Sequence, residues 1–243
     1  MATLFISDLH LDPARPAITA LLLDFLTQRG RQADALYILG DLFEAWIGDD
    51  DDAELGQTVA AALRALTDQG VPGYFLHGNR DFLLGERFAT ASGLQLLPES
   101  IIIELAGEPV LLLHGDTLCT DDVDYQAFRA QVRTPAWQTR TLALPLTQRR
   151  ALAGQLRETS QQALQQKVTE ITDVNLAEVN RVMRAHGVCS LIHGHTHRPA
   201  IHQWLLDGQA ARRAVLGDWH QQGSVLCCDA AGWWLETLPM PGA

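Results

Sequence analysis

The stretch LIHGHTHRPA, residues 191–200, contains three of the chain's nine histidines. Its first two residues read as the end of a buried strand, and Gly194 lets the backbone turn sharply there. His195 and His197 would then reach a common point beyond the edge of a sheet, which is where α/β folds place their chemistry. A hydrogen-bonded surface pair of histidines is the alternative. The residues at the ends of the other strands distinguish a metal site from such a surface pair.

Apolar runs of the β type alternate with helical patterns along the chain. In residues 16–29 the apolar side chains recur at helical spacing, and the last forty residues look like turn-linked antiparallel strands. This order predicts an α/β (α+β) fold in which two sheets stack between helices. Strands are predicted at 3–6, 35–39, 74–76, 101–105, 110–113 and 188–192, and helices at 16–29 and 53–69.

The strands of the βα pattern all end in residue types that bind metals, usually beside a glycine. Each fragment alone is weak, because such short motifs are more often turns. Five of them at equivalent positions predict a metal centre at one edge of the fold. The predicted ligands are Asp8, His10, Asp41, Asn79, His114, His195 and His197.

The ligand types indicate which metals can bind. Imidazole, carboxylate and amide donors suit borderline to hard divalent ions, so Mn²⁺, Fe²⁺ and Zn²⁺ are all compatible. The set has no thiolate, which argues against a structural zinc site. Seven ligands are too many for one such ion and suit two, with Asp41 shared between them. Two ions roughly 3.5–4 Å apart form a clamp for phosphoryl transfer.

Five motifs carry a family resemblance: DLH, GDLFEAWIGDD, GNRDF, HGDTLCTDD and HGHTHRP, in that order. With them the chain resembles the calcineurin-like metallophosphoesterase superfamily over nearly its whole length. The two longest motifs are similar to those of the UDP-2,3-diacylglucosamine pyrophosphohydrolases of lipid A biosynthesis. The resemblance implies a four-layer αββα sandwich of two mixed sheets with an inserted helical cap. It also implies hydrolysis of the pyrophosphate bond of UDP-2,3-diacylglucosamine by metal-activated water, giving UMP and 2,3-diacylglucosamine 1-phosphate (lipid X).

The same resemblance assigns roles to residues of this chain. It implies two Mn²⁺ per chain, one bound by Asp8, His10, Asp41 and His197, the other by Asp41, Asn79, His114 and His195. It implies catalytic roles for Arg80, Asp41 and His195. Around the substrate head group it places Asn79, Arg80, Asp122, Ser160, Lys167 and His195. Leu164 stands where the family usually has an asparagine, so no substrate contact is expected there.

Arg80 follows Asn79 at a position where many members of the superfamily have a histidine that can protonate an alkoxide. Arginine cannot donate a proton near neutral pH, but its planar fork can neutralise charge on a phosphate. A phosphate leaves without protonation, so Arg80 favours a diphosphate substrate. A surface ion pair of Arg80 with Asp81 is the alternative.

Residues 122–171 are predicted to form the inserted helical cap, and residues 1–121 and 172–243 the dimetal core. Between residues 126 and 170 lie seven basic and two acidic side chains, in a chain of net charge −11. This segment is either a solvated helical surface or a basic face for an anionic ligand. The acidic loop 49–52 is expected to be solvated. Five aromatic residues are either core or the wall of an apolar chamber for two acyl chains: Trp46, Phe82, Tyr125, Phe128 and Trp137.

The net charge of −11 disfavours a nucleic-acid binder held by phosphate contacts. The four cysteines have no CxxC spacing, which indicates a reduced, cytoplasmic protein. No apolar run approaches the roughly 18 residues of a membrane span, so any membrane association would be peripheral. The family resemblance implies a place on the cytoplasmic face of the inner membrane, and we expect a monomer. A phosphodiesterase or nuclease on the same core is the alternative enzyme, and a scaffold without metals is the non-catalytic one.

Overall fold

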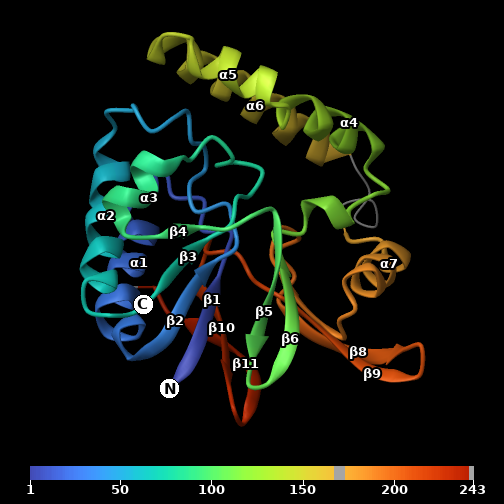
Figure 1. The fold of residues 1–243 in the computed structure, drawn as a ribbon. Coiled ribbons are helices and arrows are strands. Elements are labelled where there is room, and N and C mark those ends of the chain that lie inside the picture. The colour runs from blue at the N-terminus through green and yellow to red at the C-terminus, as the bar shows by residue number, and fades with distance from the viewer. Residues whose placement is uncertain (167–172, 241–243) are drawn as a thin grey trace.

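The structure, a computed structural model, describes residues 1–166 and 173–240, with side chains described for 1–160 and 173–240. Two β-sheets face each other, and helices cover their outer faces (Figure 1). The first sheet has six strands in the order β11-β10-β1-β2-β3-β4. Its strands are β1 Ala2–Ile6, β2 Ala33–Ile38, β3 Gly73–Phe75, β4 Gln95–Leu96, β10 Gly223–Asp229 and β11 Gly232–Leu238.

The second sheet has five strands in the order β5-β6-β7-β9-β8. These strands are β5 Ser100–Leu105, β6 Glu108–Leu113, β7 Ser190–His193, β8 Ala200–Leu206 and β9 Gln209–Val215. In the first sheet β1 to β4 run parallel, β10 pairs antiparallel with β1, and β11 pairs antiparallel with β10. In the second sheet β7 lies parallel between β6 and β9, while β5 and β8 pair antiparallel with β6 and β9. Both sheets are therefore mixed, as predicted.

Helices α1 Pro16–Gln28, α2 Glu54–Thr67 and α3 Glu86–Ser92 cover the first sheet, and α7 Leu176–His186 covers the second. Short 3₁₀ turns, η1 Gly30–Gln32 and η2 Asp116–Leu118, follow α1 and β6. The helices α4 Val123–Val132, α5 Pro135–Leu142 and α6 Leu146–Gln166 lie together above one edge of the two sheets (Figure 1). They occupy the segment predicted to form a cap.

Alternation along the strands builds three apolar layers. On β1, Leu4 and Ile6 point toward α1–α3, while Phe5 points into the space between the sheets. On β6, Leu112 packs in the same layer as Phe5, between the sheets, and Leu111 packs in the layer under α7. Because successive side chains of a strand point to opposite faces, both faces of each sheet are buried. This confirms the predicted four-layer αββα architecture.

The predicted strands and helices are all present, with ends shifted by one or two residues. Residues 101–105 and 110–113 pair antiparallel as expected. The final strands form two hairpins, β8–β9 and β10–β11. No helix among residues 1–166 and 173–240 is long and apolar enough to cross a bilayer.

The acidic loop 49–52 is solvated only in part: the side chains of Asp50 and Asp52 are 55% and 77% exposed, as predicted, but the loop also makes contacts that the prediction did not include. The carboxylate of Asp49 accepts hydrogen bonds from the backbone N–H groups of Gly85 and Phe88 and so holds the start of α3. Asp50 forms a bidentate pair with Arg149 of α6, with Nη1 2.6 Å from Oδ1. The loop bridges a core helix and the cap, because its partners come from distant parts of the chain.

The basic side chains of the cap combine features of both alternatives considered from the sequence. Arg150 and Arg157 are 47% and 41% exposed, Arg129 and Arg133 line the space beneath the cap, and several also pair with carboxylates of the core. Arg129 Nε lies 2.6 Å from Asp116 Oδ2, and Arg150 lies 2.6 Å from Asp51. The positive segment therefore neutralises acidic groups of the core and fastens the cap to it.

Candidate metal centre and substrate cavity

The loops that follow five strands bring the predicted metal ligands to one place beneath the cap (Figure 1). Three of these strands belong to the first sheet and two to the second, so the centre spans both sheets. Asp8 and His10 follow β1, Asp41 follows β2, Asn79 follows β3, His114 follows β6, and His195 and His197 follow β7.

One half of the cluster consists of Asp8, His10 and His197. The Nε2 atoms of His10 and His197 lie 3.3 Å apart, and Asp8 Oδ1 lies 3.3 Å from His197 Nε2. The other oxygen of Asp8 accepts hydrogen bonds from the Ser7 hydroxyl and the His195 N–H. Asp8 Oδ1 is buried and makes no hydrogen bond to the described residues. An acceptor held in this way between two imidazoles fits a divalent cation.

The other half consists of Asn79, His114 and His195. Asn79 Oδ1 lies 3.0 Å from His114 Nε2 and 2.9 Å from His195 Nδ1. Asp41 stands between the halves, with Oδ2 3.8 Å from His10 Nε2 and 3.7 Å from His114 Nε2. The carboxylate predicted to be shared therefore faces both groups of ligands.

The electrostatics of the cluster favour a cation. Burial opposes protonation of His197, but the carboxylates of Asp218 and Asp8 outweigh it and raise its pKa to about 10. Burial likewise opposes protonation of His114, yet Asp41 and Asp8 raise its pKa. The donor set of imidazole nitrogens and hard oxygens thus fits a divalent metal.

Five of the seven predicted ligands adopt a left-handed backbone. The φ angles are 57° for Asp8, 49° for His10, 53° for Asp41, 68° for His195 and 56° for His197. Such values are uncommon outside glycine, and they persist only where the surrounding structure enforces them. The surrounding structure therefore holds these loops in an uncommon conformation.

Two glycines beside these ligands are required by close packing. A Cβ atom at Gly78 would lie 2.1 Å from Asp41 Oδ1, and one at Gly194 would lie 2.3 Å from Asp8 Oδ2. Any side chain at either position would displace a ligand carboxylate. The glycines that mark the strand ends in the sequence thus make room for the ligands.

Several of the clustered imidazoles have a second partner on the ring nitrogen that faces away from the cluster. His114 Nδ1 lies 2.8 Å from the carbonyl oxygen of Leu39, and His197 Nδ1 lies 3.4 Å from Asp218 Oδ2. His10 Nδ1 lies 3.2 Å from Glu44 Oε2, at ion-pair distance but without the geometry of a hydrogen bond. Such outer partners fix the orientation and tautomer of a metal-binding histidine.

Asp218, His220 and Glu44 were missed from the sequence. His220 Nδ1 bonds to Asp218, and its ring stacks on His10 with centroids 5.8 Å apart. Asp218 follows β9 as Gly217-Asp218, which repeats the glycine–aspartate pattern of Gly40-Asp41 after β2. That repetition could have identified it.

Arg80 sits next to the cluster. Its backbone N–H donates to Asp41 Oδ1 at 2.8 Å, and its Nη2 donates to Ser160 Oγ at 3.3 Å. Its Nε is buried and makes no hydrogen bond to the described residues. Asp81 accepts instead from the N–H groups of Leu42 and Gly78. The guanidinium thus keeps a donor for a ligand, and the carboxylate of Asp81 is used by the backbone.

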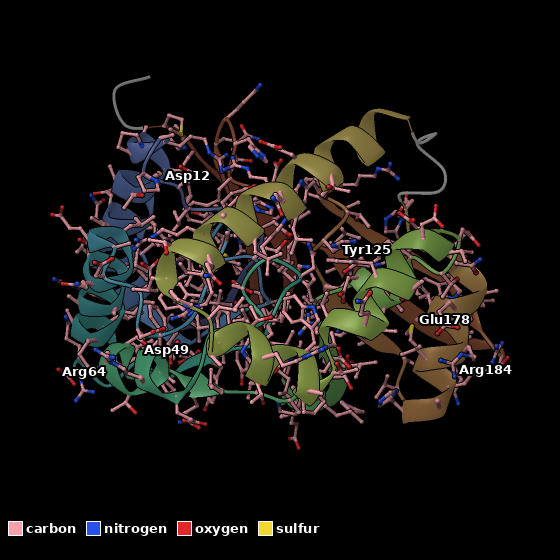
Figure 2. All side chains as sticks on the ribbon, turned by 90° about the horizontal axis from the view of Figure 1, so that it is seen from above. Asp12, Asp49, Arg64, Tyr125, Glu178 and Arg184 are labelled. Carbon is pink, nitrogen blue, oxygen red and sulfur yellow. The ribbon has the colours of Figure 1, made fainter. Side chains whose placement is uncertain are left out.

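A cavity of about 530 Å³ lies between the core and the cap. Its core side includes His10, Asp41, Asn79, His195 and His197, and its cap side includes Phe128, Trp137, Leu152 and Leu156. All five aromatic residues singled out from the sequence line it. Figure 2 looks down on the cap helices, with Tyr125 on α4, and with Asp12 and Asp49 on the side of α1–α3. One space thus joins the metal cluster to an apolar wall.

The remaining predicted substrate residues are distributed as follows. Asp122 lines the cavity and caps α4, its side chain accepting from the Tyr125 N–H at 3.1 Å. Ser160 lines the cavity beside Arg80. Lys167 and the side chain of Leu164 lie outside the described residues.

The chain is similar to several known proteins. The family model of the calcineurin-like phosphoesterases matches residues 1–199. Curated relatives named UDP-2,3-diacylglucosamine hydrolase include those of Stenotrophomonas maltophilia (strain R551-3), at 58% identity over 98% of this chain and 99% of theirs, and Escherichia coli O7:K1, at 58% over 93% and 94%. A solved archaeal phosphodiesterase covers 98% of this chain and 100% of its own, at 11% identity with a TM-score of 0.49. On the strength of the family model and the relatives, the chain belongs to the calcineurin-like phosphoesterase family.

Proposed function

We propose that the chain hydrolyses the diphosphate bond of UDP-2,3-diacylglucosamine, releasing UMP and 2,3-diacylglucosamine 1-phosphate in lipid A biosynthesis. The observation that carries this proposal is the cavity, which joins a cluster of metal-ligand side chains to an apolar wall of the cap. A small phosphodiester would use only the first part. A diphosphate that carries two acyl chains uses both, and relatives at 58% identity bear the name of this activity.

The proposed cofactor is two Mn²⁺ ions per chain, with other divalent ions as alternatives. Asp8, His10, Asp41 and His197 would hold one ion, and Asp41, Asn79, His114 and His195 the other. The short separations among these donors and the position of Asp41 between them support this division. A divalent pair bound there would supply Lewis acidity to the phosphate oxygens and an activated water.

The side chains around the cluster would bind and orient the diphosphate. Arg80 offers a fixed cation and a donor, since its backbone and Nη2 are anchored to Asp41 and Ser160. Burial, together with the neighbouring His114, lowers the pKa of His195 to about 4, so this ring is neutral at physiological pH. Asn79, Asp122, Ser160 and Lys167 are proposed to complete the binding of the head group.

The apolar part of the cavity is proposed to hold the acyl chains. Residues 122–171 would act as the substrate-binding cap, and residues 1–121 and 172–243 as the dimetal core. A lipid substrate of this kind resides in a membrane, so we propose that the chain works as a peripheral protein on the cytoplasmic face of the inner membrane. We also propose that it is a monomer. A nuclease or a scaffold without metals would have no use for a cavity that joins metal-ligand side chains to apolar ones.

The reaction is tested by mass spectrometry of the products formed from UDP-2,3-diacylglucosamine in H₂¹⁸O. We expect UMP and the diacyl sugar phosphate, with ¹⁸O in only one of them, which identifies the phosphorus that is attacked. Bis-p-nitrophenyl phosphate and UDP-N-acetylglucosamine serve as the comparison substrates. A chain that turned over either comparison substrate faster than the diacyl one would be a general phosphodiesterase.

Arg80 should contribute charge and not a proton. We expect Arg80→Ala to lower turnover of the diphosphate roughly 10²-fold, the size of effect seen for a single electrostatic donor in an active site. Arg80→His should not restore it, because no leaving-group proton is needed. The rates of both variants are measured across pH 6–9, and Arg80→Lys serves as the charge-keeping control. Parental activity in the histidine variant would show that a proton donor suffices at this position.

A further inference from the structure

Glu44 lies in the motif GDLFEAWIGDD, after β2, and points at two different parts of the molecule. Its Oε2 is 3.2 Å from His10 Nδ1, and its Oε1 is 3.1 Å from Arg157 Nε on α6. The carboxylate is mostly buried, with 13% of the side chain exposed. One carboxylate therefore stands between a proposed metal ligand and a helix of the cap.

Arg157 makes a second contact with the core from the same guanidinium. Its Nη1 lies 3.0 Å from Asp12 Oδ2 while its Nε faces Glu44. Asp12 and Glu44 come from the loops after β1 and β2, the loops that carry His10 and Asp41. The fork of Arg157 thus joins two loops of the centre to α6.

We propose that Glu44 is a positioning residue that links the metal centre to the cap, so that divalent metal binding and docking of α6 stabilise each other. This inference rests on the proposed role of His10 as a metal ligand. A carboxylate behind the ring nitrogen orients a ligating histidine. The other oxygen of the same carboxylate orients Arg157, and such coupling between two binding events is reciprocal.

The chemistry of the carboxylate supplies a sharp variant. Both oxygens of Glu44 face nitrogen atoms: Oε2 faces His10 and, at 3.6 Å, Arg15, while Oε1 faces Arg157. Glutamine has the same shape but only one acceptor, because its amide nitrogen donates. In Glu44→Gln a donor must face either the imidazole or the guanidinium. The fold should survive while one of the two contacts is lost.

Two measurements without substrate test the link. Free Mn²⁺ is titrated by its electron paramagnetic resonance signal, and amide hydrogen exchange of residues 151–160 is followed with and without Mn²⁺. We expect Mn²⁺ to slow exchange in this segment of the parent. Glu44→Gln should bind Mn²⁺ roughly 10-fold more weakly and lose the slowing. Arg157→Lys keeps the charge but cannot reproduce the two contacts of the fork, so it should also lose most of the slowing.

Arg150→Lys is the matched control. Arg150 lies on the same helix and is exposed to a similar degree, but its partners Asp51 and Asp52 do not touch a proposed ligand. This variant should keep both the Mn²⁺ affinity and the Mn²⁺-dependent slowing. The inference is overturned if Mn²⁺ leaves exchange in the parent unchanged, or if Glu44→Gln matches the parent in both measurements. A parent that binds no Mn²⁺ would overturn the proposed metal centre as well.

Discussion

Asp41→Asn is expected to lower turnover of the diphosphate at least ~10³-fold while leaving the fold intact, within the range that metal-assisted catalysis supplies. Asp41 Oδ2 faces both His10 and His114, so an amide nitrogen there removes the shared anion from both halves of the cluster. The amide oxygen can still accept from the Arg80 N–H, as Oδ1 does now. Asparagine also tolerates the left-handed backbone of this position.

The measurements are turnover, Mn²⁺ stoichiometry and the thermal midpoint of unfolding. Asp207→Asn is a matched control, because Asp207 also has a positive φ, of 53°, but lies in the β8–β9 hairpin and pairs with Arg184. That variant should retain full activity. Near-normal turnover by Asp41→Asn with two ions still bound would rule out the shared role of this carboxylate.

Removing most of the cap should abolish hydrolysis of the diacyl substrate while sparing that of a small activated phosphodiester. The variant replaces residues 134–166 with a Gly/Ser linker. It keeps α4, because the buried carboxylate of Asp116 accepts hydrogen bonds from two α4 side chains, the Tyr125 hydroxyl at 2.8 Å and Arg129 Nε at 2.6 Å. Losing about six buried methylenes at about 0.8 kcal/mol each would cost between three and four orders of magnitude in kcat/KM.

Assays at saturating Mn²⁺ separate this effect from any change in metal affinity. Point variants address the chance that the truncated chain does not fold: Leu152→Asp and Leu156→Asp place a charge in the apolar wall. Each should raise the KM for the diacyl substrate at least ~10-fold, since a buried unpaired charge is costly. Leu142→Asp, at an exposed position of α5 that does not line the cavity, should not. A truncated chain that still prefers the diacyl substrate would show that the acyl chains bind elsewhere.

The sheets and the metal cluster could be predicted because both follow from local patterns. Short apolar runs marked the strands, and a glycine beside a polar residue marked most of their ends. Because parallel strands end at the same edge of a sheet, the sequence alone predicted that the motifs lie close together. The same reasoning would have reached Asp218, had the end of β9 been treated like the others.

The docking of the cap could not be predicted, because it depends on single pairs far apart in the sequence. Asp50 and Arg149 are ninety-nine residues apart, and neither lies in a periodic pattern. A run of four aspartates looks solvated unless its cationic partners are known. The contacts of Glu44 likewise could not be predicted, because they depend on where the fold places His10 and Arg157. The chain pairs these charges through tertiary structure, on which local propensity has no bearing.

The left-handed backbone of five proposed metal ligands has a consequence for how the protein can be stabilised. A left-handed backbone costs roughly 1 kcal/mol for each of the five residues. Together these costs are about as large as the whole free energy of unfolding of many small domains. Glycine at these positions would relax the main chain but remove the ligands, so thermostability and turnover are opposed there. Heat-tolerant variants are therefore best sought in the three apolar layers. A descendant freed from catalysis would be expected to drift toward glycine and asparagine in these loops.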